Sequence, residues 1–155
     1  MKTIALSIVF LLLAVSAAFA ANNSTVTVTA TVVTQNQCKF TTTTAAVNFG
    51  TIDPTNTGDV TVSAALIVRC VGKDPLATFI ISDDGLYELG PDLNRMKHAT
   101  LAEYLPYDFT VSPVSATIPK NTDYTVTVTG TLKAIDHQNA YPGSYTDIVV
   151  LTITP

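Results

Sequence analysis

The chain contains no tryptophan and few charged side chains, and both shortages limit what it binds. Lys, Arg, Asp and Glu make up 13% of the 155 residues, about half of the ~25% usual for globular domains. The formal net charge is −4, whereas nucleic-acid binding requires a clustered basic face. We therefore expect no nucleic-acid partner. The absence of the flat indole ring also disfavours a sugar-stacking surface.

The residues that most catalytic and metal sites require are scarce as well. The two histidines, His98 and His137, lie in polar stretches, which predicts solvated loop side chains. No Gly-x-Ser-x-Gly or His-Glu-x-x-His motif and no nucleophile–base pair is present. Asp83, Asp84 and Asp92 lack the alternating oxygen-ligand spacing of a calcium loop and are interpreted as turn formers. The sequence therefore predicts no enzyme activity, no metal site and no cofactor.

Only two cysteines are present, Cys38 and Cys70. In an exported protein, two cysteines most simply form one disulfide, although two free thiols or half of a metal site remain alternatives. Closing a loop of this length stabilises the folded state by roughly 3–4 kcal/mol in the chain-entropy model. The pairing predicts an oxidising compartment.

The first 20 residues have the pattern of a secretory signal peptide. Lys2 supplies the positive charge, Ile4 to Val15 is an apolar run, and Ala18-Phe19-Ala20 is a small-x-small cleavage site. A membrane anchor is the alternative, but a spanning helix needs roughly 20 apolar residues. We expect cleavage after Ala20, which leaves 135 residues with a net charge of −5. This length suits one domain.

Threonine is abundant, and it alternates with small apolar residues from Ser24 to Val33. Period-two alternation places every apolar side chain on one face of an extended strand. Such a strand either pairs within its own domain or is donated to another subunit. Periodicity alone does not choose between these two outcomes.

The rest of the mature chain shows strand patterns and no amphipathic helix. About seven short strands separated by turn signals are typical of a β-sandwich. Pro106 interrupts one of them and predicts an edge or a bulge there. The stretches 83–100 and 136–143 are expected to be loops. Besides 25–33, the expected strands are Ala45–Phe49, Val60–Cys70, Ala77–Ile81, Tyr104–Val111, Tyr124–Lys133 and Tyr145–Thr154.

Three tyrosines have two alternative interpretations. Tyr104, Tyr107 and Tyr141 either line a carbohydrate surface or are buried or half-buried in the sandwich. Burial is the more common state of tyrosine in a β-sandwich, so we favour it.

Several motifs, taken together and in order, resemble the spore coat protein U family, which contains the subunits of archaic chaperone–usher pili. The resemblance covers residues 24–155, but the Trp-Gly segment frequent in the family is missing between Thr110 and Pro119. The matching elements are Cys38, Val47-Asn48-Phe49-Gly50-Thr51-Ile52-Asp53-Pro54, Leu66-Ile67-Val68-Arg69-Cys70, Asn94-Arg95-Met96, Leu105-Pro106-Tyr107 and Pro142-Gly143-Ser144-Tyr145-Thr146-Asp147-Ile148-Val149.

The resemblance implies an all-β, immunoglobulin-like sandwich that is incomplete, with about six strands of its own. A strand donated by a neighbouring copy would complete it. Residues 21–37 would form the donor strand and spacer, and 38–155 the pilin domain. The donor face would be Val26, Val28, Ala30 and Val32, and the acceptor groove and chaperone-binding strand would present Val149, Leu151 and Ile153.

The resemblance also implies partners and a location. The partners would be further copies of the chain, related pilins, a periplasmic chaperone and an outer-membrane usher. The chain would be exported through the periplasm to a pilus at the cell surface. A secreted monomeric β-sandwich that binds a surface or a carbohydrate through its loops is the alternative function.

Overall fold

The structure is a computed structural model that describes residues 27–31, 36–90 and 93–155. Residues 27–31 belong to a separate unit from the rest; all five are exposed, and none lies in a helix or strand. The expected signal peptide lies outside the described residues.

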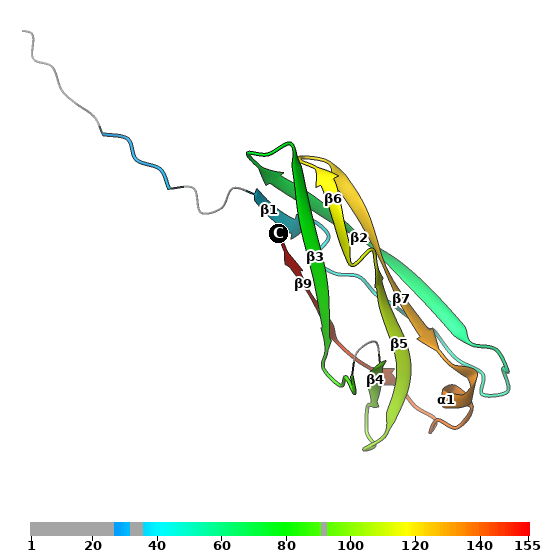
Figure 1. The fold of residues 1–155 in the computed structure, drawn as a ribbon. Helices are drawn as coiled ribbons and strands as arrows, with labels where there is room; N and C mark the ends of the chain where they lie inside the picture. The colour runs from blue at the N-terminus through cyan, green and yellow to red at the C-terminus, as the bar shows by residue number, and fades with distance from the viewer. Residues whose placement is uncertain (1–26, 32–35, 91–92) are drawn as a thin grey trace, which may run out of the picture. The chain divides into compact units, whose positions relative to one another are not determined.

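Residues 36–155 form an all-β sandwich of two antiparallel sheets (Figure 1). The larger sheet has the order β1-β2-β7-β5-β4-β8 and the smaller one β6-β3-β9. Their bounds are β1 Asn36–Phe40, β2 Val60–Gly72, β3 Leu76–Gly85, β4 Leu93–His98, β5 Tyr104–Ser112, β6 Ser115–Pro119, β7 Asp123–Leu132, β8 Tyr145–Thr146 and β9 Val149–Thr154, with one short helix, α1, at Ala134–Gln138.

The strands that alternate most cleanly in sequence form the centre of the larger sheet. β2 pairs with β7 along ten residues, from Val60 opposite Leu132 to Arg69 opposite Asp123. Inward side chains of both strands are buried or half-buried, and outward serine and threonine hydroxyls pair across the strands, as in the Ser63–Thr129 contact of 2.8 Å. The largest fully buried side chains are Phe79, Ile118, Leu132, Val68, Val126, Asn94 and Cys70.

The predicted disulfide is confirmed. Cys38 of β1 and Cys70 of β2 are direct cross-strand partners whose Cα atoms are 4.0 Å apart, and both side chains are buried. β1 also contacts β9, and the two strands lie side by side in Figure 1. The disulfide therefore holds the outer strand of the larger sheet beside the outer strand of the smaller one.

Some expected elements differ from those observed. The strand expected at Ala45–Phe49 is absent, although Val47 and Phe49 still pack against the core. The stretches expected as loops contain β4 and the end of α1, and neither β1 nor β6 was expected. The described residues hold nine strands, more than the six expected of the incomplete sandwich, because several are short.

Pro106 lies where β5 is paired on one side only. β7 pairs with β5 from Asp108 onward, whereas Pro106 has only Arg95 of β4 opposite it. His98 N donates to Glu103 O, so alternation along this ladder turns the nitrogen of Pro106 away from β4. The missing N–H is therefore not required by the sheet, as an edge position allows.

Candidate functional site

β9 is one of the two edge strands of the smaller sheet. Among the described residues it pairs only with β3, in a register that sets Ile153 opposite Ile81 and Val149 opposite Gly85. β1 contacts β9 but does not pair with it, so the main-chain groups on the other side of β9 have no strand hydrogen-bonded to them in the described part of the chain. An unpaired edge of this kind is a template for pairing with another chain.

The hydrogen-bond alternation shows which groups point to the open side of β9. Leu86 N donates to Ile148 O at 3.0 Å, which makes this pair the first hydrogen-bonded pair of the β3–β9 ladder. Successive residues of an antiparallel strand bond to alternate sides. Val150, Thr152 and Thr154 therefore bond to β3. The N–H and C=O groups of the intervening residues, Val149, Leu151 and Ile153, point outward.

The side chains of these same three residues face the interior but are incompletely covered. They pack against the core and are only half-buried, whereas Phe79 and Ile81 on the inward face of β3 are buried. Alternating with them, Ile148 and Val150 are 65% and 57% exposed on the outer face. The sandwich thus carries partly exposed core along the edge where its main chain is unpaired.

A partly buried hydrogen bond fixes the start of β9. The Tyr107 hydroxyl of β5 donates to the Asp147 carboxylate at 2.7 Å and thereby ties the residues before β9 to the larger sheet. Burial, with the hydrogen bond and charge of Asp147 and the charge of Asp83, raises the pKa of the Tyr107 hydroxyl. Tyr107 is therefore buried, as favoured from the sequence.

We expect Tyr107→Phe to lower the free energy of unfolding by about 1–3 kcal/mol, because Asp147 loses its buried partner. The raised pKa also predicts a pH effect. Above about pH 10 the unfolded tyrosine ionises while the folded one stays protonated, so stability is lost as pH rises. Urea unfolding should be measured between about pH 8 and about pH 11, which bracket the ordinary tyrosine pKa of about 10. Over this range the free energy of unfolding should fall less for Tyr107→Phe than for the unsubstituted protein.

Tyr141→Phe is the matched control, since Tyr141 is 57% exposed and its hydroxyl is not in this contact. Equal destabilisation by the two variants would contradict the anchoring role of Tyr107.

The expected donor residues are only partly within the described chain. Val28 is 88% exposed and Ala30 is exposed, and neither lies in a strand. Val26 and Val32 lie outside the described residues.

The prediction that both histidines are solvated is wrong, because His98 and His137 are 6% and 4% exposed. The His98 Nδ1 accepts the backbone N–H groups of Thr100 and Leu101 at 3.1 and 3.0 Å, so its Nε2 carries the hydrogen and donates to Pro142 O. A Cβ at Gly143 would collide with this ring. His98 therefore joins the loop between β4 and β5 to the loop before β8.

His137, in α1, contacts the loop before β2. Its Nε2 lies 3.2 Å from the backbone oxygen of Gly58. The neighbouring Gln138 side chain donates to Asn56 O at 2.8 Å. Both histidines thus hold loops together, a role that their polar sequence neighbours did not indicate.

The aspartates considered as turn formers are placed differently from that expectation. Asp83 and Asp84 lie within β3, opposite Leu151 and Val150 of β9, while Asp92 lies outside the described residues. No group of three or more His, Cys, Asp or Glu side chains suited to a metal ion occurs in the described ranges. In those ranges there is also no helix with the length and apolar character needed to span a bilayer.

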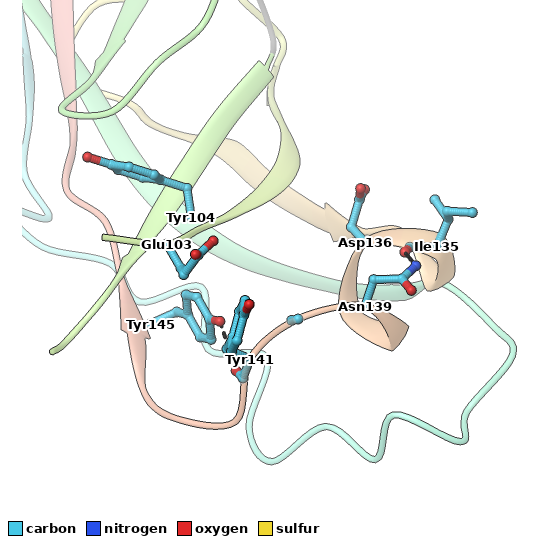
Figure 2. A pocket seen from close by; sticks show the side chains of 8 residues that line it. Glu103, Tyr104, Ile135, Asp136, Asn139, Tyr141 and Tyr145 are labelled. Atoms are coloured by element: carbon cyan, nitrogen blue, oxygen red, sulfur yellow. Dashed lines mark hydrogen bonds between the residues drawn. The ribbon is translucent and has the colours of Figure 1, made fainter. Parts of the chain in front are cut away.

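The other two tyrosines line a shallow cleft of about 360 Å³ beside α1 (Figure 2). Tyr104 and Tyr141 are 38% and 57% exposed, so the expectation of burial is wrong for these two. The Tyr145 hydroxyl donates to Tyr141 O at 2.8 Å. The lining residues are Glu103, Tyr104, Ile135, Asp136, Asn139, Ala140, Tyr141 and Tyr145.

These features define a class of protein: a β-sandwich domain with an exposed strand edge, preceded by a separate alternating segment. The family model described as Spore Coat Protein U domain matches residues 23–152. The chain belongs to this family, which comprises subunits of archaic chaperone–usher pili. The match includes the alternating segment as well as the sandwich. No curated protein matches the chain.

Membership of the family gives the general function. The chain is a pilus-type surface subunit of a structural, non-enzymatic family. Subunits of this family generally polymerise with the help of a chaperone and an usher, and they are exported to the cell surface.

Proposed function

We propose that this chain is a polymerising shaft subunit and that copies are joined by donor-strand exchange. Residues 25–33 of one copy would pair with the open side of β9 in another, with Val26, Val28, Ala30 and Val32 facing the interior. The supporting observation is that Val149, Leu151 and Ile153 combine outward main-chain groups with half-buried side chains. An added strand would form hydrogen bonds with these main-chain groups and cover these side chains.

The energy of such a joint is substantial. Burying four small apolar side chains contributes on the order of 4–8 kcal/mol. Main-chain hydrogen bonds along the added strand contribute further, because they replace bonds to water. The contact is head-to-tail and does not close on itself, so it generates a filament.

The proposal extends to the assembly route. A periplasmic chaperone would occupy the edge of β9 before assembly, because an exposed edge beside partly exposed core is prone to aggregate. An outer-membrane usher would then allow a neighbouring copy or a related pilin to replace it. This route requires export after cleavage at Ala20, with residues 21–37 as donor strand and spacer and 38–155 as the acceptor domain.

The direct test is to express the mature chain with and without residues 21–34 and to examine both by electron microscopy. We expect filaments from the complete mature chain and none from the shortened one. A shortened chain that remains a stable monomer with an unchanged melting temperature would show that its groove needs no added strand.

On the acceptor side, we expect Leu151→Asp to prevent a copy from receiving a strand, because it places a charge in an apolar groove. Such a copy still carries a donor segment. Added at low proportion to the unsubstituted chain, it should therefore shorten filaments measured by electron microscopy.

Val150→Asp is the matched control, because Val150 is 57% exposed on the opposite face of β9. Filament length should be unaffected by it. If Leu151→Asp were incorporated as freely as Val150→Asp, the assignment of β9 as the acceptor strand would be wrong.

A further inference from the structure

The two ends of the sandwich carry opposite charge. We define the basic end as Lys39 within β1, Lys73 directly after β2 and Lys120 directly after β6. Lys120 Nζ donates to Gly72 O and Lys73 O at 3.4 and 3.2 Å, while Lys39 and Lys73 are exposed. In the described ranges the ion pairs are Arg69–Asp123 and Lys133–Asp108, so none of the three lysines is paired with a carboxylate.

The opposite end carries the cleft beside α1, which we define as the acidic cleft. Glu103 and Asp136 line it together with tyrosine rings (Figure 2). Asp59 lies at the same end, since it accepts the N–H of Ala134 at 2.8 Å. Exposed apolar side chains adjoin these carboxylates, because Ile135 and Tyr141 are 69% and 57% exposed. Lys133 interacts with Asp59 and Asp136 but forms its ion pair with Asp108. The cleft therefore keeps a net negative charge beside its uncovered apolar surface.

The basic end carries matching apolar surface. Leu76 and Val71 are 53% and 38% exposed next to Lys73. The two ends are therefore complementary in charge, and both bear apolar side chains that a contact would remove from water.

The length of the spacer brings these ends together in a polymer. Three residues separate Val32, the last donor position, from Asn36, the first residue of β1. Four Cα steps span at most ~14 Å. Asn36 lies at the basic end, opposite Gly72, where its side chain donates to Asp74 at 3.1 Å. A donated strand therefore holds the basic end of its own copy close to the groove that it fills.

The direction of the donated strand selects the facing end. Along β9, Ile153 lies toward the basic end and Val149 toward the acidic cleft, because Tyr145 of the cleft comes shortly before Val149. A strand antiparallel to β9 leaves the groove at Val149 and so delivers the next copy's basic end to the acidic cleft. A parallel strand would deliver it to another basic end, where like charges repel.

We propose that the acidic cleft of one copy is the docking site for the basic end of the next copy, a proposal that rests on the proposed function. Lysines would approach the carboxylates and the tyrosine rings, and a ring attracts a cation within ~6 Å. Arg95 already occupies the ring of Tyr104, 4.4 Å from its centre, so the lysines would meet the other tyrosine rings of the cleft. This second contact would set the angle between consecutive copies and stiffen the filament.

The test uses charge reversal in the complete mature chain. One variant carries Glu103→Lys with Asp136→Lys, a second carries Lys73→Glu with Lys120→Glu, and a third combines all four. Filaments should form from each, because the donated strand is unchanged. The first two should lose at least about twofold in persistence length by electron microscopy, since exposed ion pairs contribute only modestly, and the combination should recover the lost stiffness.

Two controls vary the salt concentration and the position of the added charge. The stiffness of unsubstituted filaments should fall between about 0.01 M and about 1 M salt, over which the Debye length shrinks from about 30 to about 3 Å. Thr110→Lys, on the exposed face of β5 opposite Thr129, should leave the stiffness unchanged.

Other results would overturn the docking proposal. Filaments of unchanged stiffness and angle in both reversed variants would refute it while leaving donor-strand exchange intact. A second result would also refute docking and leave donor-strand exchange intact. In that result the cleft of the monomer binds a glycan, Glu103→Lys with Asp136→Lys abolishes the binding, and the angle between copies in the filament does not change. If the unsubstituted chain forms no filaments, both proposals fail.

Discussion

Val28→Asp should abolish filament formation while leaving the donor's own domain folded. Val28 is central to the expected donor face, so the substitution would place a carboxylate among Val149, Leu151 and Ile153 of the receiving copy. A buried, unpaired charge costs several kcal/mol, comparable with the 4–8 kcal/mol that the apolar donor face contributes. Val28 is 88% exposed and belongs to a different unit from the sandwich, so melting of the domain should be little affected. Electron microscopy and thermal unfolding report the two effects separately.

Thr29→Asp is the matched control. It adds the same charge one position along the chain, and alternation turns it to the opposite face of the strand. Filaments should therefore form from Thr29→Asp. If Val28→Asp also assembled to the unsubstituted length, residues 25–33 would not enter an apolar groove.

Replacing both cysteines by alanine should produce the largest loss of domain stability. The disulfide closes a loop between residues 32 positions apart in sequence, and the chain-entropy model gives such a cross-link roughly 3–4 kcal/mol. The melting temperature should therefore fall by about 10 °C for a domain of this size. β1 contacts β9, and without the disulfide β1 is less firmly held there. We therefore also expect the variant to accept a donated strand more slowly than the unsubstituted protein.

Reduction of the unsubstituted protein provides the comparison. A reductant should lower its melting temperature to that of the Cys38→Ala/Cys70→Ala variant and leave the variant unchanged. A variant as stable as the oxidised protein would show that β1 is held by its pairing with β2 alone.

The regular parts of the fold were predictable because their signals are local. β2 and β7 alternate over ten or more residues, so periodicity alone located them to within two residues. The disulfide followed from the count of cysteines and the expected compartment. The inward face of β9 was also visible in sequence as Val149, Leu151 and Ile153.

The remaining features depend on contacts between distant residues. β4 contains Asn94, Arg95 and Lys97, which have no apolar periodicity, and it exists because β5 pairs with it. His98 is buried because two backbone N–H groups and Pro142 O satisfy its ring. The burial of the inward side chains of β9 likewise depends on residues that are distant in sequence and lie beside β9 in the fold. The Pro-Gly-Ser-Tyr-x-Asp motif was recognised, but the partner of its Asp147, Tyr107, lies 40 residues away.

Cross-linking tests directly whether the alternating segment occupies the groove of another copy. Copies carrying Val28→Cys alone can be mixed with differently tagged copies carrying Val149→Cys, Leu151→Cys or Ile153→Cys alone, and oxidised after assembly. Neighbouring residues on adjacent strands lie within the Cα separation that a disulfide requires. We expect a disulfide between the two tagged copies for at least one of the three positions. A chain carrying Val28→Cys together with one of the three is prepared for comparison. If a disulfide formed within that chain and none formed between copies, the chain would be a self-completed monomer and strand donation would be wrong.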